Sequence, residues 1–192
     1  MRFVRRVRQP CKSRFVEMFS SHDIENMMWE DVFETRTGKL DSNAAVECGK
    51  FPFFTCAKEP LTINSYAFDQ EALLLAGNNA AGVYDVKHYN GKFNAYQRTY
   101  VLRLKGEGWS YPLFKVQLED KLSLLQNQSK GSTTKYLTMG ILKKLRFAIP
   151  PIREQREFAA FVAEVDKSKF AVRKSLESYQ KLYREQLQEA FG

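Results

Sequence analysis

The stretch that decides the fold is LRFAIPPIREQ, which runs from Leu145 to Gln155. Its first five residues are typical of a short strand. Pro150-Pro151 then breaks the strand, because proline lacks a backbone N–H and disfavours the helical conformation in the residue before it. From Arg153 to Ala190 the chain contains no proline or glycine. At about 1.5 Å per residue this run predicts a helix of roughly 57 Å, far longer than the average globular helix.

Apolar residues recur along this helix with heptad spacing. With Phe158 at position d, eight of the ten a and d positions are apolar or aromatic, which favours a coiled coil. Lys169 and Gln186 interrupt the stripe, as polar residues that set the register do. A single long helix lying on its own domain is the alternative. The residues predicted to form a dimer or spacer helix are Phe158, Val162, Val165, Val172, Leu176, Tyr179 and Tyr183.

The rest of the chain divides by charge. Residues 1–26 hold six basic and three acidic residues, residues 27–150 hold 16 and 12, and residues 151–192 hold eight and seven. We therefore expect a basic N-terminal segment over 1–26, a recognition domain over 27–150 and the long helix over 151–192.

The middle part is typical of a mixed α and β domain. Short apolar runs predict strands at 51–54, 72–76, 100–104 and 145–149. Asn90-Gly91 predicts a hairpin turn, because both residues tolerate positive φ. Apolar spacing predicts helices over 111–128 and 134–142. The fold class is thus α+β, a mixed-sheet domain followed by a long coiled-coil helix.

Composition limits the class of protein. Thirty Lys and Arg against 22 Asp and Glu give a net charge of +8, which favours nucleic acid as the partner before an anionic membrane. Fifteen Phe, nine Tyr and two Trp supply a core and exclude a disordered chain. Cys11, Cys48 and Cys56 have neither disulfide-scaffold nor zinc spacing. No apolar run approaches the ~20 residues of a membrane span, so we expect a cytoplasmic protein.

Motifs for catalysis are missing from the sequence. It has no Walker loop, no GxGxxG and no Asn/Asp-Pro-Pro-aromatic methyltransferase loop. The two histidines, His22 and His88, have no neighbouring ligand set. A metal-dependent nuclease using Asp69, Asp85 and Lys87 is a weak alternative. We expect a chain that catalyses nothing and needs no cofactor or metal.

Two polar segments are candidates for contacting double-stranded DNA. Asn and Gln pair with adenine, and Arg and Lys pair with guanine or phosphate. Small hydroxyls and a lysine at a helix start also suit a phosphate. The alternatives are a polar hairpin facing water and an ordinary helix cap. The candidate residues are Asn78, Asn79, Lys87, His88, Tyr89, Lys92, Asn94, Tyr96, Gln97, Arg98, Ser132, Thr133, Thr134 and Lys135.

A weak internal repeat links the two ends of the chain. The segment 12–20 matches 184–192 in a leading basic residue, in Glu17 and Glu189, and in Phe19 and Phe191. If the repeat is real, residues 1–26 contain the stub of a preceding long helix.

Three segments together resemble the specificity subunits of type I restriction–modification systems. They are Gly131-Ser-Thr-Thr-Lys-Tyr-Leu137, Leu145 to Gln155 with its Pro-Pro, and the long helix. Gly49 to Phe54 and Leu73 to Gly82 also resemble the target recognition domain of that family. The likeness covers about residues 27–192.

The resemblance implies two recognition domains, each followed by a long helix, with the helices packed antiparallel as a spacer. Each domain reads one half of a bipartite target. Methyltransferase subunits that use S-adenosylmethionine bind this assembly, and a restriction motor subunit adds ATP-driven cleavage. This sequence has one recognition domain, so it is expected to pair with a second copy or another half-subunit. A coiled-coil interaction protein with only non-specific DNA affinity is the rival interpretation.

Overall fold

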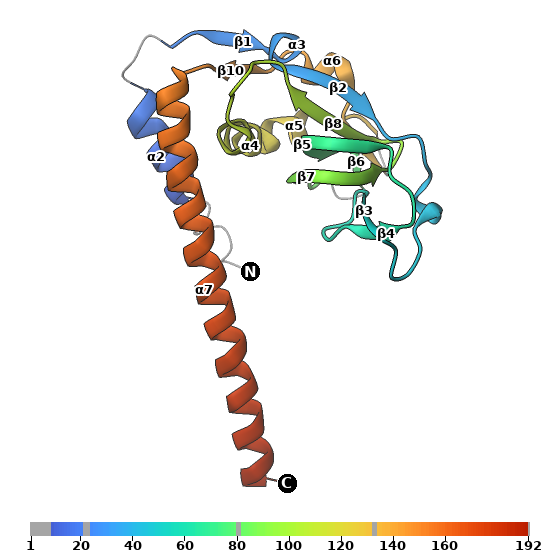
Figure 1. Ribbon diagram of the computed structural model, residues 1–192, viewed down its shortest axis with the longest axis vertical. Helices are drawn as coiled ribbons and strands as arrows, with labels where there is room; N and C mark the ends of the chain where they lie inside the picture. Colours follow the sequence, from blue (N-terminus) through green and yellow to red (C-terminus); the bar gives the residue numbers. More distant parts are fainter. Residues whose placement is uncertain (1–8, 21–23, 80–81, 132–133, 192) are drawn as a thin grey trace.

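The computed structural model describes residues 9–20, 24–79, 82–131 and 134–191. Its elements follow one another along the chain (Figure 1) as α2 (Gln9–Phe19), β1 (Asn26–Met28), α3 (Trp29–Val32), β2 (Phe33–Thr37), η1 (Ser42–Ala44), β3 (Phe51–Phe54), β4 (Leu61–Ile63), β5 (Phe68–Ala76), β6 (Asn78–Asn79), β7 (Val86–Ala95), β8 (Thr99–Leu104), α4 (Tyr111–Asp120), α5 (Leu122–Gln128), β9 (Lys135–Tyr136), α6 (Met139–Leu142), β10 (Arg146–Ala148) and α7 (Ile152–Phe191).

A six-stranded sheet forms the centre of the domain, in the order β2-β8-β5-β7-β3-β4. Its neighbouring strands are antiparallel except β3 and β7, which run parallel. Two short pairs, β1 with β10 and β6 with β9, lie beside it. The predicted α+β class with a mixed sheet is confirmed.

Helices α4 and α5 cover one face of this sheet. Successive residues of a strand point to opposite faces, and the strands carry apolar residues on both. Leu73, Leu75 and Leu102 point to the helices and join the main core. Alternate residues such as Ala72, Leu74 and Val101 belong to a second, smaller core on the opposite face.

Aromatic rings fill the main core between sheet and helices. Trp29 and Phe33 pack at 4.8 Å between ring centroids, and Phe33 meets Phe147 edge-on at 5.1 Å. The indole Nε1 of the buried Trp29 donates to Thr35 Oγ1 at 2.9 Å, which satisfies its only polar atom. These contacts join β10, the last strand before α7, to the start of the domain.

The long helix α7 confirms the prediction made from its lack of proline and glycine. Its first turns pack on α4 and on α2, which lies alongside α7 in Figure 1. Phe158 is fully buried there, with its ring 5.8 Å from those of Phe15 and Phe19. Beyond residue 169 the helix leaves the domain, and every side chain described from Phe170 to Glu189 is exposed.

A buried glutamine fixes the start of α7 to the domain. Gln155 is fully buried, and its Oε1 accepts from the backbone N–H of Ser110, the N-cap of α4, at 3.0 Å. Its Nε2 donates to the carbonyl of Pro150 at 2.9 Å. One side chain therefore joins the Pro-Pro break, the long helix and α4.

Replacing Gln155→Ala is expected to lower the free energy of unfolding by about 2–4 kcal/mol, because it leaves the buried carbonyl of Pro150 and the half-buried N–H of Ser110 without these partners. Urea denaturation of the full chain measures the change. Arg156→Ala, at the next and exposed position, is the control and is expected to change stability by less than about 0.5 kcal/mol. Equal losses in the two variants would contradict the role given to Gln155.

The predicted hairpin at Asn90-Gly91 is wrong. These residues lie inside the continuous strand β7, paired with Glu71 and Gln70 of β5. The pairing continues past the dipeptide to Phe93, whose ring stacks on Phe68 at 5.1 Å. Long-range strand pairing therefore overrides the local turn preference.

The two other predicted helices are corrected in part. The helix over 111–128 is divided at Lys121 into α4 and α5. The helix over 134–142 is reduced to α6, because Tyr136 instead exchanges two backbone hydrogen bonds with Lys130, at 3.0 and 2.7 Å. Gly131 between them has φ of 108°, a value that favours glycine.

Candidate nucleic-acid interface

The fold brings together the two segments that the sequence suggested for DNA contact. Strands β6 and β9 pair antiparallel, with Asn78 opposite Tyr136 and Asn79 opposite Lys135. These two segments are more than fifty residues apart in the sequence. We call the residues Asn78, Asn79, Arg98, Lys130, Thr134 and Lys135 the β6–β9 patch.

Arg98 belongs to this patch through its contact with β9. Its guanidinium lies 5.0 Å from the centroid of the Tyr136 ring, in the range of a cation–π contact. The Arg98 carbonyl accepts from the N–H of Gly77 at 2.7 Å, and the Gly77 carbonyl accepts from Leu137 at 2.8 Å. Backbone hydrogen bonds thus tie the start of β8 to β6 and β9.

The segment that contains β9 is rich in cations and poor in carboxylates. Residues 121–153 contain no Asp or Glu. They contain seven cations, which are Lys121, Lys130, Lys135, Lys143, Lys144, Arg146 and Arg153. Lys130 of the patch is exposed and Lys135 is half-buried. This run without carboxylates, which ends where the nearly balanced segment 151–192 begins, is a sequence signal for a basic surface.

The candidates on β7 are divided between the two faces of the sheet. Alternate residues of a strand point in opposite directions, so Lys87 and Tyr89 lie on one face while His88, Lys92 and Asn94 lie on the other. Together they cannot form one contact surface.

Asn94 is a correction. It is only 4% exposed, and its Oδ1 accepts from the N–H of Ala95 at 3.0 Å. Its Nδ2 lies 3.5 Å from the carbonyl of Ser65. The side chain is used inside the domain, so the assignment of Asn94 to DNA is wrong.

The other β7 candidates also have partners inside the domain. Lys87 pairs with Asp85 at 2.9 Å. His88 Nε2 lies 2.7 Å from Glu71 Oε1, and its ring stacks on Tyr111 at 5.4 Å. Tyr89 packs on Phe54 and Phe93. Lys92 lies 4.7 Å from the centre of the Tyr66 ring.

The remaining candidates lie between β7 and β8, at the start of β9 or outside the described residues. Tyr96 is bridged to Leu40, and Gln97 donates to Asp41 Oδ2 at 3.2 Å. Ser132 and Thr133 lie outside the described residues. Thr134 and Lys135 do not lie at a helix start, since Lys135 begins β9, so the phosphate site at a helix N-terminus is wrong.

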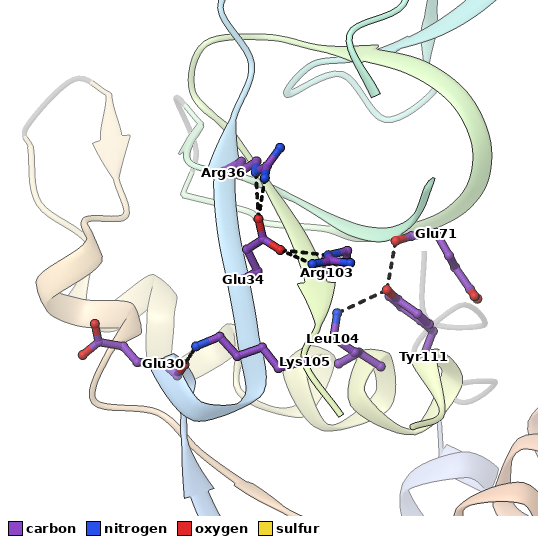
Figure 2. Close-up of polar contacts among 8 residues, drawn as sticks. All are labelled: Glu30, Glu34, Arg36, Glu71, Arg103, Leu104, Lys105 and Tyr111. Atoms are coloured by element: carbon purple, nitrogen blue, oxygen red, sulfur yellow. Dashed lines mark hydrogen bonds and ion pairs between the residues drawn. The ribbon is translucent and has the colours of Figure 1, made fainter. Parts of the chain in front are cut away.

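A cluster of charged residues on β2 and β8 was missed by the sequence. Glu34 lies opposite Arg103 in the sheet, and Figure 2 shows Arg36 and Arg103 converging on its carboxylate. Arg36 Nε and Nη2 lie 2.9 and 2.6 Å from Oε1. Arg103 Nε and Nη2 lie 2.8 and 2.6 Å from Oε2.

The two guanidinium groups control the charge of Glu34. Their hydrogen bonds, with Arg103 first and Arg36 second, lower the pKa of the carboxyl below its ordinary value. The carboxylate therefore remains charged at neutral pH. Its contribution to stability is present above its ordinary pKa and is lost as the pH falls through the lowered value.

The nuclease alternative is not supported by the geometry. Asp69 pairs with Lys92 near one end of the β5–β7 ladder, while Asp85 and Lys87 lie at the other end, roughly 17 Å away. Among the described residues no group of three or more His, Cys, Asp or Glu could hold a metal ion.

The predicted helix stripe is divided by the domain. Phe158 is fully buried in its own domain, and Val162 and Val165 are partly buried against the same core. Phe158 is therefore unavailable to a partner, which corrects its assignment. The other predicted residues, Val172, Leu176, Tyr179 and Tyr183, are 56–70% exposed.

Continuing from these residues, we call Val172, Leu176, Tyr179, Leu182, Tyr183 and Leu187 the α7 stripe, and all six are exposed. Despite its length, α7 is too polar to cross a bilayer, and the same holds for the other helices in the described part of the chain.

Comparison with known proteins identifies a family. The family model described as "Type I restriction modification DNA specificity domain" matches residues 22–178. The type I restriction enzyme EcoDI specificity subunit of Escherichia coli is 40% identical over 146 residues, which are 72% of this chain and 31% of that protein.

Solved structures show the same fold at low identity. The S subunit of a type I restriction–modification system from M. genitalium has a TM-score of 0.68 at 16% identity, over 85% of this chain and 45% of that one. The HsdS subunit of Thermoanaerobacter tengcongensis has a TM-score of 0.58 at 16% identity, over 91% and 49%. The chain thus spans about a third of the curated relative and about half of each of these two solved relatives.

Proposed function

The chain belongs to the type I restriction–modification DNA specificity family, and from this premise we propose that it reads one half of a bipartite DNA target without catalysing a reaction itself. A methyltransferase subunit that binds it would act at the site it selects, and a restriction motor subunit would add cleavage. In this proposal, residues 27–150 form the domain that recognises DNA, and residues 151–192 form the helix that sets the distance between the two halves of the target.

The main support for DNA recognition is the composition of the β6–β9 patch. It brings Asn79 beside the cation Lys135 of β9, and Arg98, which precedes β8, beside Tyr136. Adjacent strand residues point to opposite faces and the Oδ1 of Asn78 is buried, so Asn79 is the carboxamide that we assign to DNA. Carboxamides discriminate adenine, and Arg and Lys contact guanine or phosphate. Because backbone hydrogen bonds link its three segments, the patch is a formed surface and not a set of independent loops.

For the spacer, we propose that the α7 stripe pairs with that of a second copy. The stripe continues the heptad spacing beyond the point where the domain ends. Residues 151–192 are nearly neutral, with eight basic and seven acidic residues, so two such helices do not repel each other. Two copies would also supply two recognition domains, one for each half of the target.

The test is a methylation map. The chain is co-expressed with the methyltransferase subunit encoded nearest to it, in a host that lacks other adenine methylation, and a pull-down confirms the complex. We expect a palindromic bipartite motif, because two identical domains would read identical half-sites.

Two variants connect the map to the patch. Arg98→Gln with Lys135→Gln is expected to reduce methylation at the motif, and each lost base contact is worth about 1–3 kcal/mol of discrimination. Lys174→Gln, an exposed cation on α7, is the control. An intact complex that methylates nothing would instead favour the interaction protein with only non-specific DNA affinity.

A further inference from the structure

The Glu34–Arg36–Arg103 cluster contains one more arginine than an ordinary surface ion pair. One carboxylate holds two arginines, one on each of its oxygens, with four contacts of 2.6 to 2.9 Å. The arginine side chains are 63% and 56% exposed, while that of Glu34 is 29% exposed. The cations are therefore accessible and the anion lies behind them.

The cluster lies on the face of the sheet that the helices do not cover. Glu34 and Arg103 are directly opposite in the β2–β8 ladder, and Arg36 is opposite Val101 of the smaller core. The intervening Thr35 points the other way, to Trp29 in the main core. The two guanidinium groups are thus exposed on the face that the helices leave open.

The cluster keeps a net positive charge and guanidinium N–H donors that do not point to Glu34. Two cations and one carboxylate leave one net positive charge. Each guanidinium has five N–H donors and directs Nε and Nη2 to Glu34. Among the described residues, the hydrogen bonds and ion pairs of both groups all go to Glu34, so both Nη1 groups can bind another anion. The fork geometry of guanidinium matches phosphate oxygens.

We propose that Arg36 and Arg103 bind backbone phosphates of duplex DNA and that Glu34 is a positioning residue that holds both in place. This rests on the proposed function and adds a phosphate site to it. Holding the two side chains before DNA arrives reduces the conformational entropy lost on binding. The site fixes how the domain sits on the duplex and carries no sequence information itself.

The position of this phosphate site is compatible with the β6–β9 patch. Arg98 of the patch directly precedes β8, and Arg103 lies five residues further along. At about 3.3 Å per residue their backbones are separated by roughly 17 Å, which equals about five base-pair steps of duplex DNA.

The test measures binding of the full chain to a random-sequence duplex of about three helical turns, because phosphate contacts do not depend on sequence. Fluorescence anisotropy over a range of salt concentrations gives the affinity and its salt slope. Arg36→Gln and Arg103→Gln are each expected to reduce that slope by about one. Lys174→Gln, an exposed cation on α7, is expected to leave it unchanged.

The decisive variant is Glu34→Gln, since the two interpretations predict opposite signs. If Glu34 only neutralises charge, its removal strengthens DNA binding. If Glu34 positions the arginines, its removal weakens binding, by about three- to tenfold. Glu30→Gln is the matched control, because it removes an exposed carboxylate that is paired with Lys143 at 2.8 Å; we expect equal or slightly tighter binding. Thermal melts confirm that each variant is folded.

The outcomes separate the two proposals. Glu34→Gln binding as tightly as the unchanged chain, or more tightly, would overturn the positioning role. Unchanged salt slopes in both arginine variants would overturn the phosphate site while leaving DNA reading intact. If the unchanged chain binds no duplex even at low salt, the proposed function itself fails.

Discussion

A variant carrying Leu176→Glu and Tyr183→Glu is expected to be monomeric at concentrations where the unchanged chain is a dimer. Both side chains lie in the α7 stripe and are 56% and 63% exposed in the single chain. Burying each contributes about 1.5 kcal/mol or more, and a symmetric pair contains each twice. The loss is therefore roughly 6 kcal/mol, or about four orders of magnitude in dissociation constant.

Analytical ultracentrifugation over a concentration series measures this change. The control variant carries Ala171→Glu and Ser178→Glu, which adds the same charge at two exposed heptad c positions, away from the a and d seam. It is expected to dimerise as the unchanged chain does. A chain that stays monomeric at every concentration would contradict pairing of two copies.

The sequence predicts the elements whose causes are local. Pro150-Pro151 and the absence of proline and glycine afterwards are enough to place the start of α7 within a residue or two, because both act on the backbone directly. The apolar runs at 51–54, 72–76 and 100–104 also lie in strands β3, β5 and β8. These strands could be predicted because a short run of apolar residues is itself the signal for a buried strand.

Features that depend on pairing between distant residues could not be predicted in this way. Asn90-Gly91 favours a turn locally, but β5 pairs with β7 from Val86 to Phe93 and keeps the dipeptide within the strand. The Glu34–Arg103 contact joins residues 69 apart in the sequence. It exists only because β2 and β8 are neighbours in one register, and neither strand alone indicates that partner.

The heptad stripe shows the same limit on a single helix. Phe158 and Val172 have the same heptad position, yet Phe158 is buried by α2 and its own domain while Val172 is 63% exposed. Periodicity predicts which side of a helix is apolar. It does not predict whether that side meets the same chain or another.

The buried and exposed parts of α7 are expected to respond differently to loss of a phenylalanine. Phe158→Ala is expected to lower the free energy of unfolding by about 3–5 kcal/mol, because it opens a cavity between α7 and the rings of Phe15 and Phe19. Phe170→Ala removes the same side chain from a position that is 70% exposed. It is expected to change stability by less than about 0.5 kcal/mol.

Urea denaturation distinguishes the part of α7 that packs on the domain from the part beyond residue 169. The two Phe variants are compared with the variant carrying Leu176→Glu and Tyr183→Glu, at protein concentrations too low for dimers to form. The first part should affect folding of the domain, since Phe158 joins the helix to the main core. The second part should affect association and leave the unfolding of the single chain unchanged, because its apolar side chains are exposed in the single chain. If Phe158→Ala were no more destabilising than Phe170→Ala, α7 would not be anchored at this residue. The angle at which the helix leaves the domain would then have to be set by Gln155, the Pro-Pro break and the packing of Val162 and Val165 on the core.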